Sequence, residues 1–118
     1  MLFFVSMQIL QAPTTTGKLK ETAAALFGDM VKAVVDVDRR LIALDAELNS
    51  DLEALLLENG SSQNALWGIN LHPDLKAEEF VEFDSLINIR PSQKNMGRGV
   101  DDKATRAKII DIVRQWIK

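Results

Sequence analysis

The sequence predicts a single α+β domain over residues 1–118, with one mixed sheet of about five strands and three helices in the order β-α-β-β-α-β-β-α. The chain of 118 residues has the size of one ordinary domain. Its 47% hydrophobic and 26% charged residues are typical of a globular protein. Apolar, β-branched segments alternate along the chain with amphipathic segments that carry helix start and stop signals, and no internal repeat is present.

The first half of the chain predicts a strand, a helix and a hairpin. Residues 1–10 (MLFFVSMQIL) are expected to form the first strand. A helix is expected over 18–27, because Thr14–Thr16 offer N-cap oxygens and Gly28 stands where a helix commonly ends. The runs 30–37 and 41–48 are predicted to form an antiparallel hairpin through the polar link 38–40. The first two strands are joined through a helix, so they are parallel if they are neighbours, which makes the sheet mixed.

The second half predicts a short helix, two strands and a final helix. Ser50 and Glu53 match a capping box, so a helix is expected from there to about Glu58. The run 65–71 is predicted to be a strand, and 79–89 to be one long strand or two strands with a bulge. The last helix is expected to begin after Asp101 or Asp102. Its predicted buried face consists of Ala107, Ile110, Val113, Trp116 and Ile117.

Composition excludes several kinds of chemistry. The chain has no cysteine, which removes disulfides, thiol nucleophiles and thiolate metal sites. It has one histidine, His72, so we expect no tightly bound transition metal and no cofactor. The apolar run at residues 1–10 is much shorter than the roughly 20 residues of a membrane span. We therefore expect a cytoplasmic protein with no membrane partner.

Charge is unevenly distributed along the chain. Residues 1–87 carry six basic and fourteen acidic side chains, whereas residues 88–118 carry eight basic and three acidic ones. This asymmetry indicates either a basic binding face or a solvated helix that packs near acidic strands. Nucleic acid is the less favoured partner, because the aromatic residues are not interleaved with the basic ones. Trp67 and Trp116 are expected in the core or in a dimer interface.

The long polar segment from Arg90 to Val100 is the main candidate for ligand binding. Arginine offers a planar fork that suits carboxylate or phosphate, and long polar loops often carry function. The spacing of its glycines and basic residues does not match a P-loop. An ordered connector without a ligand is therefore as open an interpretation as a binding loop. The predicted ligand-binding residues, for a small anionic ligand, are Asn88, Arg90, Ser92, Gln93, Asn95 and Arg98.

An acidic group precedes this segment in the chain. Asp36 and Glu47 are the two members predicted to face the Arg90 loop, and Asp38, Asp45 and Asp51 lie close to them in sequence. Paired carboxylates can hold a hard divalent cation or exchange protons. The alternative interpretation is a set of solvent-facing carboxylates on an amphipathic hairpin, and we predict no metal site.

Several segments resemble a small prokaryotic family of uncharacterised proteins, a domain of unknown function. The resemblance covers the chain from about Thr16, and its most specific part is the run Asn88–Pro91 (NIRP). It implies no activity. Members of that family often have Glu-Leu-His-Ala-Asp where this chain has ELNSD, so Asn49 replaces a histidine, which argues against a base or metal role there. The other segments that carry the resemblance are 28–37 (GDMVKAVVDV), Glu47-Leu48, 66–70 (LWGIN), 85–93 (SLINIRPSQ) and Asn95.

These observations predict a small soluble binding or interaction protein. A homo-oligomer or another protein partner is expected under this hypothesis. The alternative hypothesis is an enzyme or a small anionic-ligand-binding protein that uses the loop from Arg90 to Arg98. A structure separates the two, because a ligand site requires this loop to border a cavity that faces Asp36 or Glu47.

Overall fold

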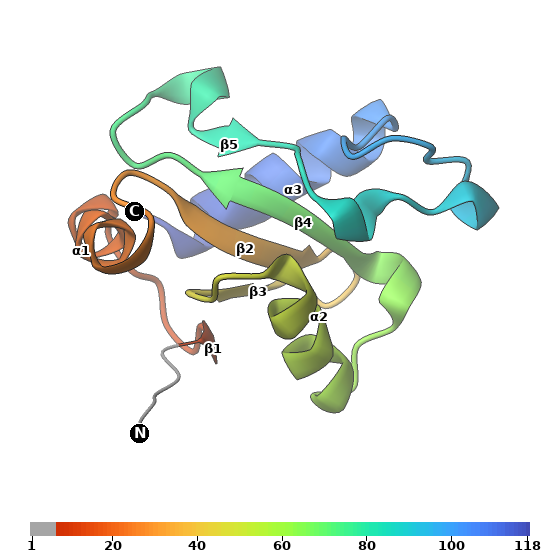
Figure 1. Ribbon diagram of the computed structural model, residues 1–118, viewed down its shortest axis with the longest axis horizontal. Coiled ribbons are helices and arrows are strands. Elements are labelled where there is room, and N and C mark those ends of the chain that lie inside the picture. The colour runs from red at the N-terminus through yellow and green to blue at the C-terminus, as the bar shows by residue number, and fades with distance from the viewer. Residues whose placement is uncertain (1–6) are drawn as a thin grey trace.

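The computed structural model describes residues 7–118, which form an α+β domain with one five-stranded sheet and three helices (Figure 1). The order of the strands across the sheet is β1-β3-β2-β4-β5. The strands are β1 (Gln8–Ile9), β2 (Val31–Asp36), β3 (Leu41–Leu44), β4 (Leu66–Leu71) and β5 (Val81–Glu82). The helices are α1 (Thr16–Leu26), α2 (Asn49–Glu58) and α3 (Lys103–Trp116). The fold class and the numbers of strands and helices are confirmed, and most of the predicted first strand (residues 1–6) lies outside the described residues.

The sheet is antiparallel rather than mixed. All four strand pairs within residues 7–118 are antiparallel. The prediction of a parallel pair required β1 to lie beside β2, but β1 lies on the outer side of β3. The β2–β3 hairpin and the long β2–β4 pairing occupy both edges of β2, so β2 has no free edge for β1.

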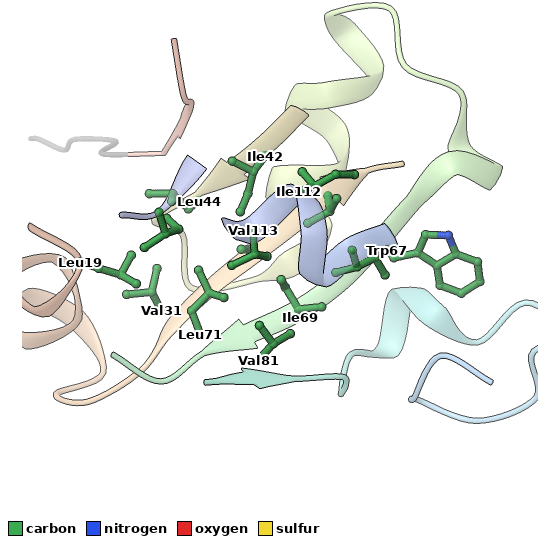
Figure 2. Close-up of a cluster of buried hydrophobic side chains, with 14 of the residues drawn as sticks. Leu19, Val31, Ile42, Leu44, Trp67, Ile69, Leu71, Val81, Ile112 and Val113 are labelled. Carbon is green, nitrogen blue, oxygen red and sulfur yellow. The ribbon is translucent and has the colours of Figure 1, made fainter. Parts of the chain in front are cut away.

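Helices cover both faces of this sheet. Figure 1 shows α2 in front of the strands and α3 behind them. Leu52 and Leu56 of α2 pack with Val34, Ala43 and Leu66. On the other face, α1 and α3 pack over the alternate residues of the same strands, a cluster that includes Leu19, Ile69, Leu71, Ile112 and Val113 (Figure 2). Because both of its faces are covered, β4 is buried along its whole length.

The ends of α1 and α3 follow the predicted signals, whereas the start of α2 does not. The Thr15 hydroxyl accepts a hydrogen bond from the Lys18 backbone N–H, and the Asp102 carboxylate accepts one from the Thr105 N–H. The predicted capping box at Ser50 is wrong: Leu48 is the N-cap of α2 and supplies no side-chain hydrogen bond. The helix begins earlier because the neighbouring Asn49 side chain turns toward the sheet and donates to the Ala33 carbonyl at 2.9 Å.

The buried face of α3 is rotated from the predicted one. Ile109, Ile112, Val113 and Ile117 are buried, whereas Ala107 is exposed and Ile110 is only partly covered. Ile109, Ile112, Val113 and Trp116 follow the i, i+3, i+4, i+7 spacing of one helical face. The prediction counted the small Ala107 as a core residue. This choice moved the predicted buried face away from Ile109 and Ile112. Trp116 is half-buried, and its indole N–H donates to the Arg40 carbonyl at 2.9 Å.

The predicted strand over 79–89 is replaced by a two-residue strand and 3-10 turns. The chain leaves the sheet after β5, and a 3-10 turn follows at Leu86–Asn88. The Ser85 hydroxyl accepts from the Ile87 N–H and starts that turn. A shorter strand also replaces 41–48, because β3 ends at Leu44 and Asp45 has a φ of 77°, outside the strand region.

Candidate functional site

Asn88 and Asn95, two of the predicted ligand-binding residues, are buried and bond to the protein's own backbone. The Asn88 side chain accepts from the Gly68 N–H at 2.8 Å and donates to the carbonyls of Gly68 and Arg98, each at 2.9 Å. Asn95 donates to the carbonyls of Asn88 and Gly99 at 2.8 Å and accepts from the Asp101 N–H at 2.9 Å. Both amides therefore hold the shape of the loop.

Arg90 also makes contacts of a structural kind. Its guanidinium donates to the backbone carbonyls of Gln63 and Leu66 and lies 4.2 Å from the centroid of the Trp67 ring. Burial lowers the pKa of Arg90, and the nearby Glu53 carboxylate opposes that shift. Its Nε has no hydrogen-bond partner among the described residues. The guanidinium thus links the loop to the start of β4.

Two further residues of the predicted set, Ser92 and Gln93, lie at the protein surface. Ser92 is exposed, and Gln93 donates from its side chain to the Asn64 carbonyl at 3.0 Å. A hollow of about 480 Å³ adjoins Gln93 and Lys94, and its other lining residues are Trp67, Asn95, Asp101, Asp102 and Thr105. Two carboxylates and one ammonium line it, a balance that does not favour an anion.

The two acidic residues expected to face the loop lie apart. Asp36 is fully buried, and its Oδ1 accepts from the backbone N–H groups of Asp38 and Arg39 at 2.9 and 2.8 Å. The Ser61 hydroxyl donates to its other oxygen at 2.6 Å. Asp36 therefore shapes the β2–β3 turn. Glu47 is exposed and follows β3 near the opposite end of β2.

Arg98, another residue of the predicted set, borders a cavity together with Leu48 and Asn49 at the start of α2. This cavity, which we call the Lys32 groove, has a volume of about 240 Å³. It lies on the α2 side of the sheet, between the start of α2 and the segment that follows β5. Its lining residues are Lys32, Leu48, Asn49, Ser50, Ser85, Leu86, Ile87 and Arg98.

A row of hydrogen-bonded polar side chains crosses the sheet beside this groove. Lys32, Asn70 and Glu82 are direct cross-strand neighbours on β2, β4 and β5. The Lys32 ammonium donates to Asn70 Oδ1 at 3.2 Å, and Asn70 Nδ2 donates to Glu82 Oε1 at 3.0 Å. His72 Nε2 lies 3.0 Å from the same carboxylate oxygen. The hydrogen bonds from His72 and Asn70, in that order, lower the pKa of Glu82.

Charges in and beside the groove are partly paired. Arg98 forms an ion pair with Asp84 at 2.5 Å, on the same side of the sheet as the row. The other ion pairs among residues 7–118 involve Lys20, Arg40 and His72. Lys32 is partly buried, and the Phe27 ring centroid lies 5.8 Å from its ammonium. Lys32 is thus a cation at a cavity wall whose partner in the structure is an uncharged amide.

Sequence reasoning missed Lys32, Asn70 and the His72–Glu82 contact as parts of one site. A signal was present, because Lys32 and Asn70 are polar residues in the interior of strands that are mostly apolar, VKAVVD and LWGINL. A polar side chain in a strand with two covered faces requires a partner. The partner of Asn70 lies in β5, which was predicted as part of a long, alternating strand.

The described part of the chain offers neither a metal-binding cluster nor a membrane-spanning helix. Within residues 7–118, no group of three or more His, Cys, Asp or Glu side chains is placed to hold a metal ion. Nor does that part of the chain contain a helix of sufficient length and hydrophobicity to cross a bilayer.

Comparison with protein families shows which family the chain resembles over most of its length. The model of the family described as "Protein of unknown function (DUF5674)" matches residues 8–116, which is nearly the whole described chain. Comparisons with curated proteins and with solved structures gave no match. The matched range includes the sheet, the three helices and every residue of the Lys32 groove. The chain therefore belongs to the DUF5674 family of proteins of unknown function.

Proposed function

We propose that this protein binds a small anionic ligand in the Lys32 groove. The observation that carries the proposal is the placement of Lys32. Its ammonium is partly buried at the wall of a cavity and contacts the Asn70 amide rather than a carboxylate. A cation in a partly desolvated site gains more from an anion than it does in bulk water, because the effective dielectric constant is lower.

The start of α2 also borders the groove and contributes backbone N–H groups, whose positive potential is partly offset by Asp51 in the first turn. Asn49 and Ser50 are the first residues of this helix and line the cavity. The N-terminal end of a helix carries a partial positive charge and has free backbone N–H groups. The N-cap residue Leu48 offers no side-chain acceptor for them. These N–H groups support the proposal as an addition to the charge of Lys32.

The test compares two lysine variants. Lys32→Gln removes the ammonium from the groove, whereas Lys108→Gln removes an exposed one on α3, behind the opposite face of the sheet. Purified protein is titrated with sodium salts of carboxylates and phosphates and followed by NMR shifts. We expect Lys32→Gln to weaken binding at least tenfold and Lys108→Gln to leave it unchanged. Equal affinities in the two variants would contradict the proposal.

A second candidate function is protein interaction at the same place. Two leucines that line the groove are unusually exposed, Leu48 at 57% and Leu86 at 66%. Exposed large apolar side chains that lie together are typical of interaction sites. Sedimentation of the wild type against Leu86→Ser tests this function, with Leu57→Ser on α2 as the control. A dimer that only Leu86→Ser dissociates would favour interaction over ligand binding.

A further inference from the structure

We infer that the ligand of the Lys32 groove is a small monocarboxylate with a compact hydrocarbon group. This inference rests on the proposed function and deepens it, because it names the chemical class of the anion. It uses three properties of the groove: its size, its balance of charges and the exposed leucines at its wall.

The size of the cavity limits the ligand. Pockets that enclose drug-sized ligands and cofactors have volumes of about 300–1,000 Å³. The Lys32 groove, at about 240 Å³, lies below that range. A nucleotide or dinucleotide would extend beyond it, whereas an organic acid of a few carbon atoms fits within it.

The balance of charges favours a single negative charge. Of the two cations that line the groove, Lys32 has no carboxylate partner among residues 7–118, whereas Arg98 already shares its charge with Asp84. Glu82 is the cross-strand neighbour of Asn70 on β5. Hydrogen bonds from His72 and Asn70 favour the ionised form of its carboxylate. Glu82 does not line the groove, but it lies behind Asn70 and repels the second charge of a dianion such as phosphate, so a dianion gains less than a monoanion.

Asn70 keeps the charge of Lys32 available to the ligand. Its amide stands between Lys32 and Glu82, with its oxygen toward the ammonium and its nitrogen toward the carboxylate. A direct contact between the two charged groups would neutralise the lysine. The neutral amide instead separates them, and the hydrogen bonds at both ends fix its orientation.

The apolar wall explains why the anion also carries a hydrocarbon group. Leu48, Leu86 and Ile87 line the groove together with the polar groups, and the two leucines are more than half exposed. A hydrocarbon chain laid against them leaves water. Each buried methylene group strengthens binding about fourfold, which corresponds to about 0.8 kcal/mol. A carboxylate without such a chain would use only the charged half of the site.

The experiment is a titration of the wild-type protein with matched probes, followed by NMR shifts of groove residues. The probes are 4-methylpentanoate, its uncharged amide, acetate, succinate and inorganic phosphate. We expect 4-methylpentanoate to bind at least tenfold more tightly than each of the others. Lys32→Gln should reduce its affinity to that of the amide, and Leu86→Ser, a change at an exposed site, should reduce it toward that of acetate.

A further variant tests the charge argument separately. Glu82→Gln removes the carboxylate across from Asn70 and retains a side chain of the same shape. We expect it to raise the affinity for phosphate and succinate while that for 4-methylpentanoate changes less. Phosphate and succinate affinities in Glu82→Gln that equal those of the wild type would overturn the charge argument.

The outcomes separate this inference from the proposed function. Preference for phosphate or succinate in the wild type, lost in Lys32→Gln, would overturn the monocarboxylate inference and leave anion binding in place. Absence of any groove shift with all five probes, in wild-type protein whose spectrum is that of a folded domain, would overturn both.

Discussion

At the scale of single residues, Asn88 acts as a substitute for a strand. β5 pairs with β4 only at Asn70 and Leu71, so Gly68, which pairs with Val34 of β2 on one side, has no strand beside it on the other side among residues 7–118. The Asn88 amide bonds to both the N–H and the C=O of Gly68, as a neighbouring strand would. Glycine is required there, because a Cβ at position 68 would lie 2.5 Å from Ser85 Oγ. The conspicuous Asn88–Pro91 run is thus explained in part by the closure of a sheet edge.

The two arginines of the predicted ligand loop should respond differently to substitution. Arg90→Ala removes two hydrogen bonds to carbonyls and the contact with Trp67, and it leaves the partly buried Leu66 carbonyl without that donor. We expect a loss of about 2–3 kcal/mol in the free energy of unfolding. Arg98→Ala removes an exposed ion pair and should cost about 0.5 kcal/mol.

Urea unfolding of both variants measures this difference. The interpretation of the loop as a ligand site, rather than as an ordered connector, requires Arg90→Ala to keep near-native stability. Equal and small losses in the two variants would restore that interpretation for Arg90. In the structure, Arg90 makes contacts with backbone carbonyls and Trp67, whereas Arg98 lies at the wall of the Lys32 groove.

At the scale of elements, α2 begins without a side-chain cap. Leu48→Asn supplies an acceptor for the free N–H groups and removes a leucine that is 57% exposed. We expect it to raise the free energy of unfolding by about 0.5–1 kcal/mol. Leu48→Asp should stabilise the helix similarly, but its carboxylate at the groove wall should weaken anion binding further than Leu48→Asn does.

Chemical denaturation and the probe titration together check this prediction. A destabilisation by both variants would show that the packing of Leu48 outweighs the missing cap. Equal anion affinity in the two variants would show that the start of α2 does not contribute to the electrostatics of the groove.

Elements were predictable where one local signal dominated. The strands β2 and β4 are almost continuously apolar, and α1 and α3 have capping residues that act as expected. Prediction failed where a side chain competes with the backbone pattern. The Ser85 hydroxyl accepts a hydrogen bond from the Ile87 N–H and starts a 3-10 turn in a segment whose alternating pattern predicted a strand. The Asn49 side chain donates to the Ala33 carbonyl of the sheet, and the predicted capping box at Ser50 does not form. The groove was not predictable in full. Lys32 and Arg98 are far apart in sequence, and only the folded sheet places both at the wall of one cavity.

At the scale of the whole molecule, the basic C-terminal quarter of the chain does not form one face. Arg98 lies at the groove on the α2 side, Arg90 lies against Trp67, and α3 covers the opposite face of the sheet. Asp111 on α3 pairs with Arg40 of the β2–β3 turn at 2.8 Å. This division of charge is consistent with the expectation against nucleic acid, which stays a prediction, as do the cytoplasmic location and a homo-oligomer.

The free energy of unfolding should decrease at acidic pH, as the carboxylates of Glu82 and Asp102 become protonated. The pKa of Glu82 is lowered from 4.5 by His72 and Asn70, and that of Asp102 is lowered from 3.8 by its hydrogen bonds with Thr105. A group whose pKa is lower in the folded state stabilises the fold above its unfolded pKa and loses that contribution as the pH falls through its folded pKa. The loss should therefore begin near pH 5 and continue below pH 4.

Urea unfolding at pH 7, 5, 4 and 3 measures this dependence in the wild type and in Glu82→Gln. The variant lacks the ionised group, so its stability should decline less steeply between pH 5 and pH 3. The difference is expected to be small, because the Glu82 side chain is 48% exposed and water screens its contacts. Glu78→Gln, at an exposed site on the 3-10 turn before β5, serves as the control and should follow the wild type. Parallel curves for Glu82→Gln and the wild type would show that the row Lys32–Asn70–Glu82–His72 does not stabilise the folded protein through the charge of Glu82.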